Sequence, residues 1–116
     1  MNATQFENQA NKLQLDNNDI EIKYQSKIPK KILGLCYNFP KGTFFDGDFC
    51  RKISLKEILE PIEYFNVDFP KHRLIPVFDC GDNDFIVYRI SDGKWLKFNI
   101  VDELSFCESD DWKTLI

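Results

Sequence analysis

The sequence predicts an α+β domain in which a twisted, mainly antiparallel sheet is flanked by helices. Three observations support this class. Two apolar segments around an Asp-Gly pair at 92–93 have the pattern of a β-hairpin, and an apolar stretch at 74–78 precedes them. A capped helix is predicted to begin at Ser54. The length of 116 residues suits one domain, so residues 1–116 are predicted to fold around a single core.

The first nineteen residues are rich in Asn and Gln, which weakens any structural prediction for them. Phe6, Ala10 and Leu13 nevertheless recur at helical spacing. This spacing favours a weak amphipathic helix within residues 1–19. A partly disordered leader is the alternative.

Two short elements are predicted next. Ile20, Ile22 and Tyr24 alternate with charged residues, a pattern typical of a short strand. Residues 28–33 follow and are predicted to start a helix. Pro29 suits its first position, where a missing N–H costs nothing.

The clearest local signal is a helix start at Ser54. Ser54 can cap the first turn, and Glu57, three residues later, can reach back to complete a capping box. Ile53 and Ile58 are spaced as a hydrophobic staple. Pro61 is predicted to end or kink this helix early.

Turn residues separate the remaining segments. Residues 40–48 are predicted as two turns around a short strand at 43–45, and residues 68–70 as a loop. Residues 74–78 are predicted as an apolar strand. Pro76 within it suits an edge or a bulge, because proline has no N–H for the ladder.

The hairpin is predicted from two apolar segments, residues 85–90 and 95–100. The Asp-Gly pair at 92–93 supplies the positive φ that a two-residue primed turn requires. With that turn, Ile90 lies opposite Trp95.

The two faces of this hairpin differ in composition. One face is predicted to be core and holds Phe85, Val87, Arg89, Leu96, Phe98 and Ile100. The other is mixed and holds Ile86, Tyr88, Ile90, Trp95, Lys97 and Asn99. The mixed face is either covered by a helix or offered to a ligand. Tyr88 and Trp95 are therefore candidate partner-binding residues.

Acidic charge is concentrated in the last third of the chain. The formal net charge is −4, and residues 79–116 carry nine acidic against four basic residues. Residues 1–78 are nearly balanced, with ten acidic and eleven basic. An acidic field repels nucleic acid and favours a basic protein partner. The alternative is that these charges only keep the protein soluble.

The cysteines and the N-terminus predict a soluble cytoplasmic protein. Cys36, Cys50, Cys80 and Cys107 lack the spacing of a zinc or redox motif, so reduced and mostly buried thiols are expected. The first residues show no secretory signal. No apolar run approaches the roughly 20 residues of a membrane helix.

Motifs for catalysis or metal binding are not found. His72 is predicted as an exposed loop residue. Residues 79–84 resemble a calcium loop, but Ile86 stands where an oxygen ligand is needed. The acidic pairs at 102–103 and 110–111 are predicted as solvated helix starts. No phosphate-binding loop or nucleophile elbow is present. The prediction is a non-enzyme without metal or cofactor.

The order of these segments resembles the SUKH superfamily, which includes a yeast cell-wall-synthesis regulator and many bacterial immunity proteins. About half the chain carries the resemblance. The matching segments are the capped helix at 53–58, the Ile-Pro strand at 74–78, the Gly/Asp turn at 79–84, the hairpin at 85–100 and residues 100–106, which are similar to the family's closing helix. Ile28-Pro29 is similar to its Leu-Pro helix start.

The resemblance implies a non-catalytic, protein-binding role. In bacteria such domains commonly neutralise a toxin, and many of these toxins are basic nucleases. An immunity protein that binds its cognate toxin is the leading prediction. A regulatory or scaffold module that binds a cellular partner unrelated to toxins is the alternative.

The predicted docking surface is acidic. It comprises Asp79, Asp82 and Asp84 at the head of the hairpin, with Asp102 and Glu103 just past its end. The two groups emerge together because the hairpin brings its first and last residues to one end. The alternative, for Asp79 and Asp102 in particular, is that each carboxylate caps its own turn.

Overall fold

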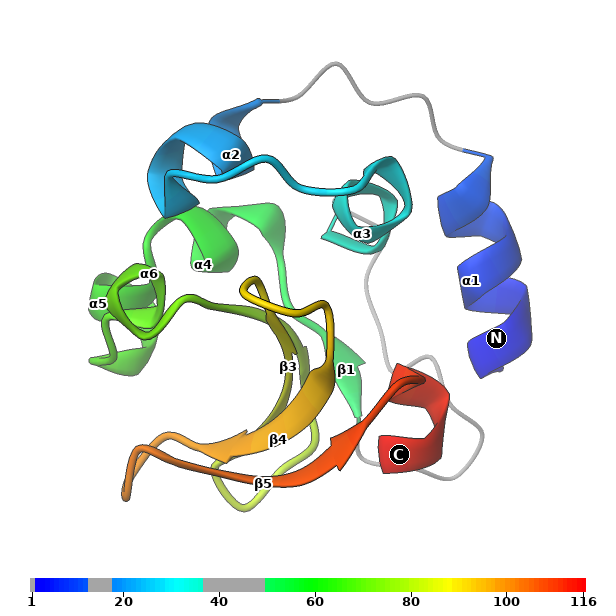
Figure 1. The fold of residues 1–116 in the computed structure, drawn as a ribbon. Coiled ribbons are helices and arrows are strands. Elements are labelled where there is room, and N and C mark those ends of the chain that lie inside the picture. The colour runs from blue at the N-terminus through cyan, green and yellow to red at the C-terminus, as the bar shows by residue number, and fades with distance from the viewer. Residues whose placement is uncertain (1, 13–17, 37–49) are drawn as a thin grey trace.

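The computed structural model describes residues 2–12, 18–36 and 50–116. The predicted α+β class is confirmed: a five-stranded sheet lies among short helices (Figure 1). In chain order the elements are α1 Ala3–Asn11, α2 Asp19–Tyr24, α3 Lys30–Cys36, β1 Arg51–Lys52, α4 Leu55–Leu59, α5 Pro61–Phe65, α6 Phe69–His72, β2 Leu74–Asp79, β3 Asp84–Arg89, β4 Trp95–Asn99, β5 Leu104–Ser109 and the 3-10 helix η1 Trp112–Leu115. The predictions for Leu13 and for residues 40–48 lie outside the described residues.

The sheet runs in the order β1-β2-β3-β4-β5, and every neighbouring pair is antiparallel. The short strand β1 pairs only with Phe78 and Asp79 at the end of β2. The register of β2 shifts between Pro76 and Phe78. Of the two predictions for Pro76, the bulge is confirmed, because β2 lies inside the sheet and not at its edge.

Helices cover both faces of the sheet. On one face, α5 and α6 pack on the hairpin through aromatic rings. The ring centroids of Phe65 and Phe85 are 4.8 Å apart, and those of Phe69 and Phe98 are 5.3 Å apart. On the other face, Phe78 of β2 stacks on Trp112 of η1 at 4.6 Å. Figure 1 shows α5 and α6 on one side of the strands, and α1 with η1 on the other.

Helix α1 confirms the predicted N-terminal helix. Asn2 and Gln5 form a reciprocal capping box, and Phe6 and Ala10 are buried one turn apart. The helix packs against α3, whose Gly34 has no side chain at the point of contact. A weakly apolar helix is thus stabilised by tertiary packing.

The strand predicted at residues 20–24 is wrong, because this segment is the helix α2. Ile20 and Tyr24, one helical turn apart, are buried, whereas Ile22 is 67% exposed. The hydroxyl of Tyr24 donates a hydrogen bond to the carbonyl of Ile58 at 2.8 Å. In so short a segment, apolar residues two and four positions apart fit both the two-residue period of a strand and the 3.6-residue period of a helix. The long-range bond from Tyr24 to Ile58 favours the helix.

The predicted helix starts at Pro29 and Ser54 agree with α3 and α4 to within one residue. Helix α3 begins at Lys30, one residue after the predicted Pro29. Ser54 and Glu57 cap α4 reciprocally, and Pro61 ends it and begins α5. The loop predicted at 68–70 is wrong, because Asp68 accepts a hydrogen bond from the Lys71 amide and caps the single turn of α6.

The hairpin is confirmed, but its predicted register is wrong. Tyr88, and not Ile90, lies opposite Trp95. The connection spans residues 90–94 and is closed by a 2.8 Å bond from the Arg89 amide to the Lys94 carbonyl. The Asp92 carboxylate accepts hydrogen bonds from Arg89 and from the Lys94 amide, which stabilises this wider loop. The shift of two residues leaves each predicted face intact.

The closing helix implied for residues 100–106 is also wrong. Residues 100–103 form a turn, and Leu104–Ser109 form the edge strand β5 of the described sheet. Asn99 Oδ1 accepts hydrogen bonds from the amides of Val101 and Asp102, both at 3.0 Å, and these bonds stabilise the reversal of the chain. Cys107, at φ 55°, occupies a bulge where the register shifts. The helix start predicted at 102–103 is therefore a turn between strands.

Candidate functional site

Two turns meet at one end of the sheet, as the predicted acidic surface requires. The turn after β2 and the turn after β4 are joined by a 2.9 Å bond from the Ile100 amide to the Asn83 carbonyl. Alongside it, Asn99 Nδ2 donates to Asp84 Oδ1 at 2.9 Å. These bonds bring Asp82, Asp84 and Asp102 to the same end.

The turn after β2 needs residues that tolerate positive φ. Gly81, Asp82 and Asn83 have φ values of 82°, 51° and 66°. Glycine accepts this region freely, and Asp and Asn accept it better than other side chains. The Cys80 amide closes the turn by donating to the Asp84 carbonyl at 2.8 Å. The backbone therefore holds Asp82 outward in a defined position.

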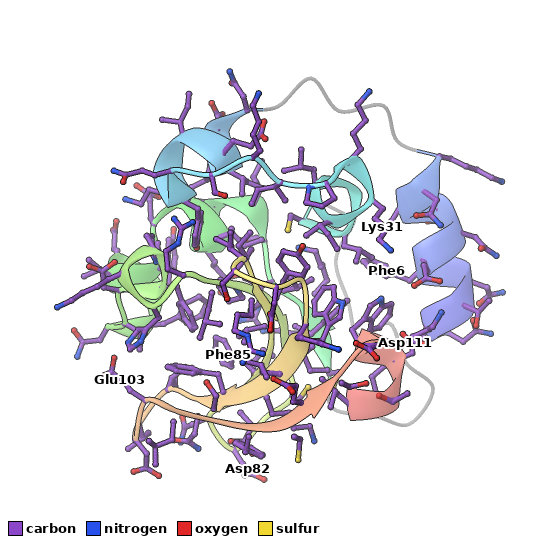
Figure 2. The ribbon with its side chains drawn as sticks, in the orientation of Figure 1. Phe6, Lys31, Asp82, Phe85, Glu103 and Asp111 are labelled. Atoms are coloured by element: carbon purple, nitrogen blue, oxygen red, sulfur yellow. The ribbon has the colours of Figure 1, made fainter. Side chains whose placement is uncertain are left out.

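Two of the five predicted carboxylates are engaged elsewhere. Asp79 lies 3.4 Å from the Arg51 guanidinium and accepts the Gly81 amide at 3.0 Å, as its turn-capping alternative proposed. Glu103 pairs with His72 of α6 at 3.0 Å. Figure 2 shows Glu103 well apart from Asp82, so the five carboxylates do not converge on one point.

At the opposite end of the hairpin, the acidic side chains form ion pairs with basic residues. Arg89 pairs with both Asp92 and Glu108, and Lys94 pairs with Asp110. The hydrogen bond from Arg89 lowers the pKa of Asp92 to about 2. The basic residues of this region are therefore committed to that end.

The first end keeps its negative charge. Asp82 and Asp102 have no ion pair with any other described residue, and Asp84 is bonded to a neutral amide. The basic side chain closest to Asp84 in the strand register is Lys97 of β4, two residues before Asn99, which lies opposite Asp84. Three carboxylates against one ammonium leave this end acidic.

Exposed apolar side chains lie beside these carboxylates. Val101, Leu104 and Phe106 are 69%, 65% and 41% exposed. Leu104 lies opposite Asn99, which in turn lies opposite Asp84, so the three form one row across the strands. We call this surface the β5 corner; it comprises Asp82, Asp84, Val101, Asp102, Leu104 and Phe106. Sequence reasoning missed its apolar part because residues 100–106 were assigned to a helix.

Tyr88 and Trp95, the other predicted binding residues, are buried. Their exposed fractions are 6% and 4%, and their rings meet edge to face at 5.3 Å. Burial raises the pKa of Tyr88. This pair of the mixed hairpin face is therefore buried in the domain.

A surface pocket of about 370 Å³ borders Trp95, between α1, α3 and the C-terminal segment. Lys31 and Asp111 lie in its wall (Figure 2). Lys113 and the Trp112 indole both bind Glu7, at 2.7 and 3.1 Å. Every buried side-chain nitrogen or oxygen of the described residues has a hydrogen-bond partner.

Lys52 is a buried charge that sequence reasoning missed. Its ammonium donates to the Ile53 carbonyl and, at 3.4 Å, to that of Cys36. Burial lowers the pKa of Lys52 to about 8 and raises that of Cys36 to about 11. The alternation of side chains along a strand could have predicted this burial, because Lys52 is two residues from buried Cys50 and so points to the same face.

The ring of His72 contacts the exposed carboxylate of Glu103 at 3.0 Å and the buried ring of Phe98, with ring centroids 5.4 Å apart. Within residues 2–12, 18–36 and 50–116, no three His, Cys, Asp or Glu side chains are grouped so as to hold a metal ion. In the same ranges no helix has the length and apolar character needed to cross a bilayer. The chain matches no protein-family model, no curated protein and no solved structure.

Proposed function

We propose that this chain is a non-catalytic protein-binding domain that docks a basic partner on the β5 corner, in the manner of an immunity protein that neutralises its cognate toxin. One observation carries the proposal: an edge strand with exposed Leu104 and Phe106 beside carboxylates that form no ion pair with a described residue.

The apolar part of the corner favours a protein as the partner. Proteins usually protect sheet edges with charged side chains, bulges or covering elements. In β5 the bulge at Cys107 lies past Phe106, and residues 104–107 carry no charge. Clustered exposed apolar side chains rimmed by polar groups are typical of protein interfaces.

The charged part favours a basic partner. Asp82, Asp84 and Asp102 lie at one end, and a cationic surface would relieve their mutual repulsion and accelerate association. The resemblance to the SUKH superfamily supports a toxin as that partner, because many toxins neutralised by such domains are basic nucleases.

The test uses the toxin domain of any large multi-domain toxin gene found immediately upstream of this chain's gene. Its affinity for the purified full chain is measured by calorimetry at about 50 mM and about 300 mM salt. Asp82→Asn with Asp102→Asn should weaken binding roughly tenfold at low salt and flatten the salt dependence. Leu104→Ser with Phe106→Ser should weaken binding about tenfold or more with the salt dependence unchanged.

The matched control removes two exposed acids elsewhere, Glu60→Gln with Glu63→Gln, and should leave affinity unchanged. Wild-type affinity in both corner variants would rule out the β5 corner as the docking surface. No binding of the toxin domain to wild-type protein would rule out the immunity function and favour a scaffold module with another partner.

A further inference from the structure

Two cysteines face each other across the first strand pair. Cys50 directly precedes β1, and Cys80 directly follows β2. Since Arg51 lies opposite Asp79, the same register places Cys50 opposite Cys80. Their Sγ atoms lie 2.6 Å apart, closer than the contact distance of two unbonded sulfur atoms.

The backbone at this pair already suits a disulfide. The Ile53 amide bonds to the Val77 carbonyl at 2.9 Å, so in this ladder Cys50 and Cys80 occupy a non-hydrogen-bonded pair. The Cys80 amide bonds instead to Asp84, across its own turn. Non-hydrogen-bonded pairs have Cα atoms about 4.5 Å apart, within the range of roughly 4.4–6.8 Å found in disulfides.

The two sulfurs differ in access. Cys50 is 4% exposed, whereas Cys80 is only half-buried at the start of its turn. A soluble oxidant therefore meets Cys80 first, with Cys50 placed behind it to resolve the product. The remaining cysteines are separate, since Cys36 contacts Lys52 and Cys107 is exposed on β5.

We propose that Cys50 and Cys80 form a redox-active dithiol that low-molecular-weight disulfides such as oxidised glutathione convert to an intramolecular disulfide. The Cys80 thiolate attacks one glutathione sulfur, forms a mixed disulfide and expels one glutathione thiolate. The Cys50 thiolate then attacks the Cys80 sulfur and expels the second. Two protein thiols are oxidised, one glutathione disulfide is reduced to two thiols, and the two protons of the protein thiols end on the two expelled glutathione thiolates.

The disulfide would fasten β1 to β2 and close a loop of the chain between residues 50 and 80. Such a link restricts the unfolded chain, and so raises the melting temperature. It would also fix the start of the turn that presents Asp82. The inference stands independently of the proposed partner, because it rests only on the cysteine pair.

The test treats the full-length chain with oxidised glutathione, then denatures and alkylates it with iodoacetamide. Intact-mass spectrometry should show alkylated cysteines falling from four to two, with no glutathione retained, and peptide mapping should identify a 50–80 cross-link. The melting temperature should rise by about 10 °C and return on reduction.

Two variants sharpen the result. Cys107→Ser should keep the 50–80 cross-link, and Cys80→Ser should abolish both the cross-link and the rise in melting temperature. Four alkylated cysteines in the treated wild-type protein, a stable glutathione adduct on Cys80, or a cross-link through Cys36 or Cys107 would each overturn the proposal.

Discussion

Tyr88 lies directly opposite Trp95 in the β3–β4 pair, and their rings meet edge to face with centroids 5.3 Å apart. This pair anchors the hairpin near its loop. Gly93 lies above it at φ 75°, and a Cβ at this position would approach the Tyr88 hydroxyl to 3.4 Å. The loop therefore depends on a residue that accepts positive φ.

Gly93→Val is expected to lower the free energy of unfolding by about 1–3 kcal/mol, because valine at this φ is strained. Urea denaturation measures the change. Ser91→Val, in the same loop but without positive φ, is the control and should change stability much less. Equal effects of the two substitutions would contradict the assigned loop conformation.

Ser54→Ala should lower the free energy of unfolding by roughly 1 kcal/mol, because the Glu57 amide at the start of α4 loses its acceptor. Thermal or urea denaturation is the measurement. Ser105→Ala, at an exposed position of β5, should stay within about 0.5 kcal/mol of wild type. A loss no larger than that of the control would show that the cap does not stabilise the domain.

Gly34→Ala should destabilise the protein, although alanine favours helices. A Cβ at Gly34 would lie 2.6 Å from the Ala10 carbonyl oxygen, so α1 and α3 would have to separate. The expected loss is about 1–3 kcal/mol, with faster hydrogen exchange in α1. Lys31→Ala, an exposed position on the same helix, is the control. A stabilised Gly34→Ala variant would contradict the close approach of the two helices.

Lys52 should make stability increase with pH in a defined window. Its pKa is about 8 in the folded protein against an ordinary 10.5, so between these values the unfolded chain binds more protons. Stability then rises with pH, by up to about 1.4 kcal/mol per pH unit. The stability of wild type minus that of Lys52→Met, from urea denaturation at several pH values, should therefore grow across this window. Parallel curves would contradict the lowered pKa.

Features governed by neighbouring residues were predictable from the sequence. The capping box of Ser54 and Glu57 spans three residues, so its geometry follows from local backbone alone. Pro61 ends α4 because the missing N–H acts at its own position. The hairpin faces also followed from alternation, which survives a register shift of two residues.

Features that depend on distant partners were not predictable. Residues 20–24 fit a strand or a helix, and the bond from Tyr24 to Ile58 is available only to the folded chain. The charges of the last third were visible in the sequence. Only the tertiary structure shows that Arg89 and Lys94 form their ion pairs at one end of the hairpin, and that Asp82 and Asp102 lie at the other end.

The sequence by itself determined the α+β class, the starts of α3 and α4 and the acidic bias of the last third, because composition, caps and periodicity act over a few residues. The tertiary structure alone decided that residues 100–103 form a turn and that the following residues form an exposed edge strand instead of a helix. It also decided that Cys50 lies beside Cys80. Both depend on strand pairing between distant segments, whose register is set by the packing of the whole sheet.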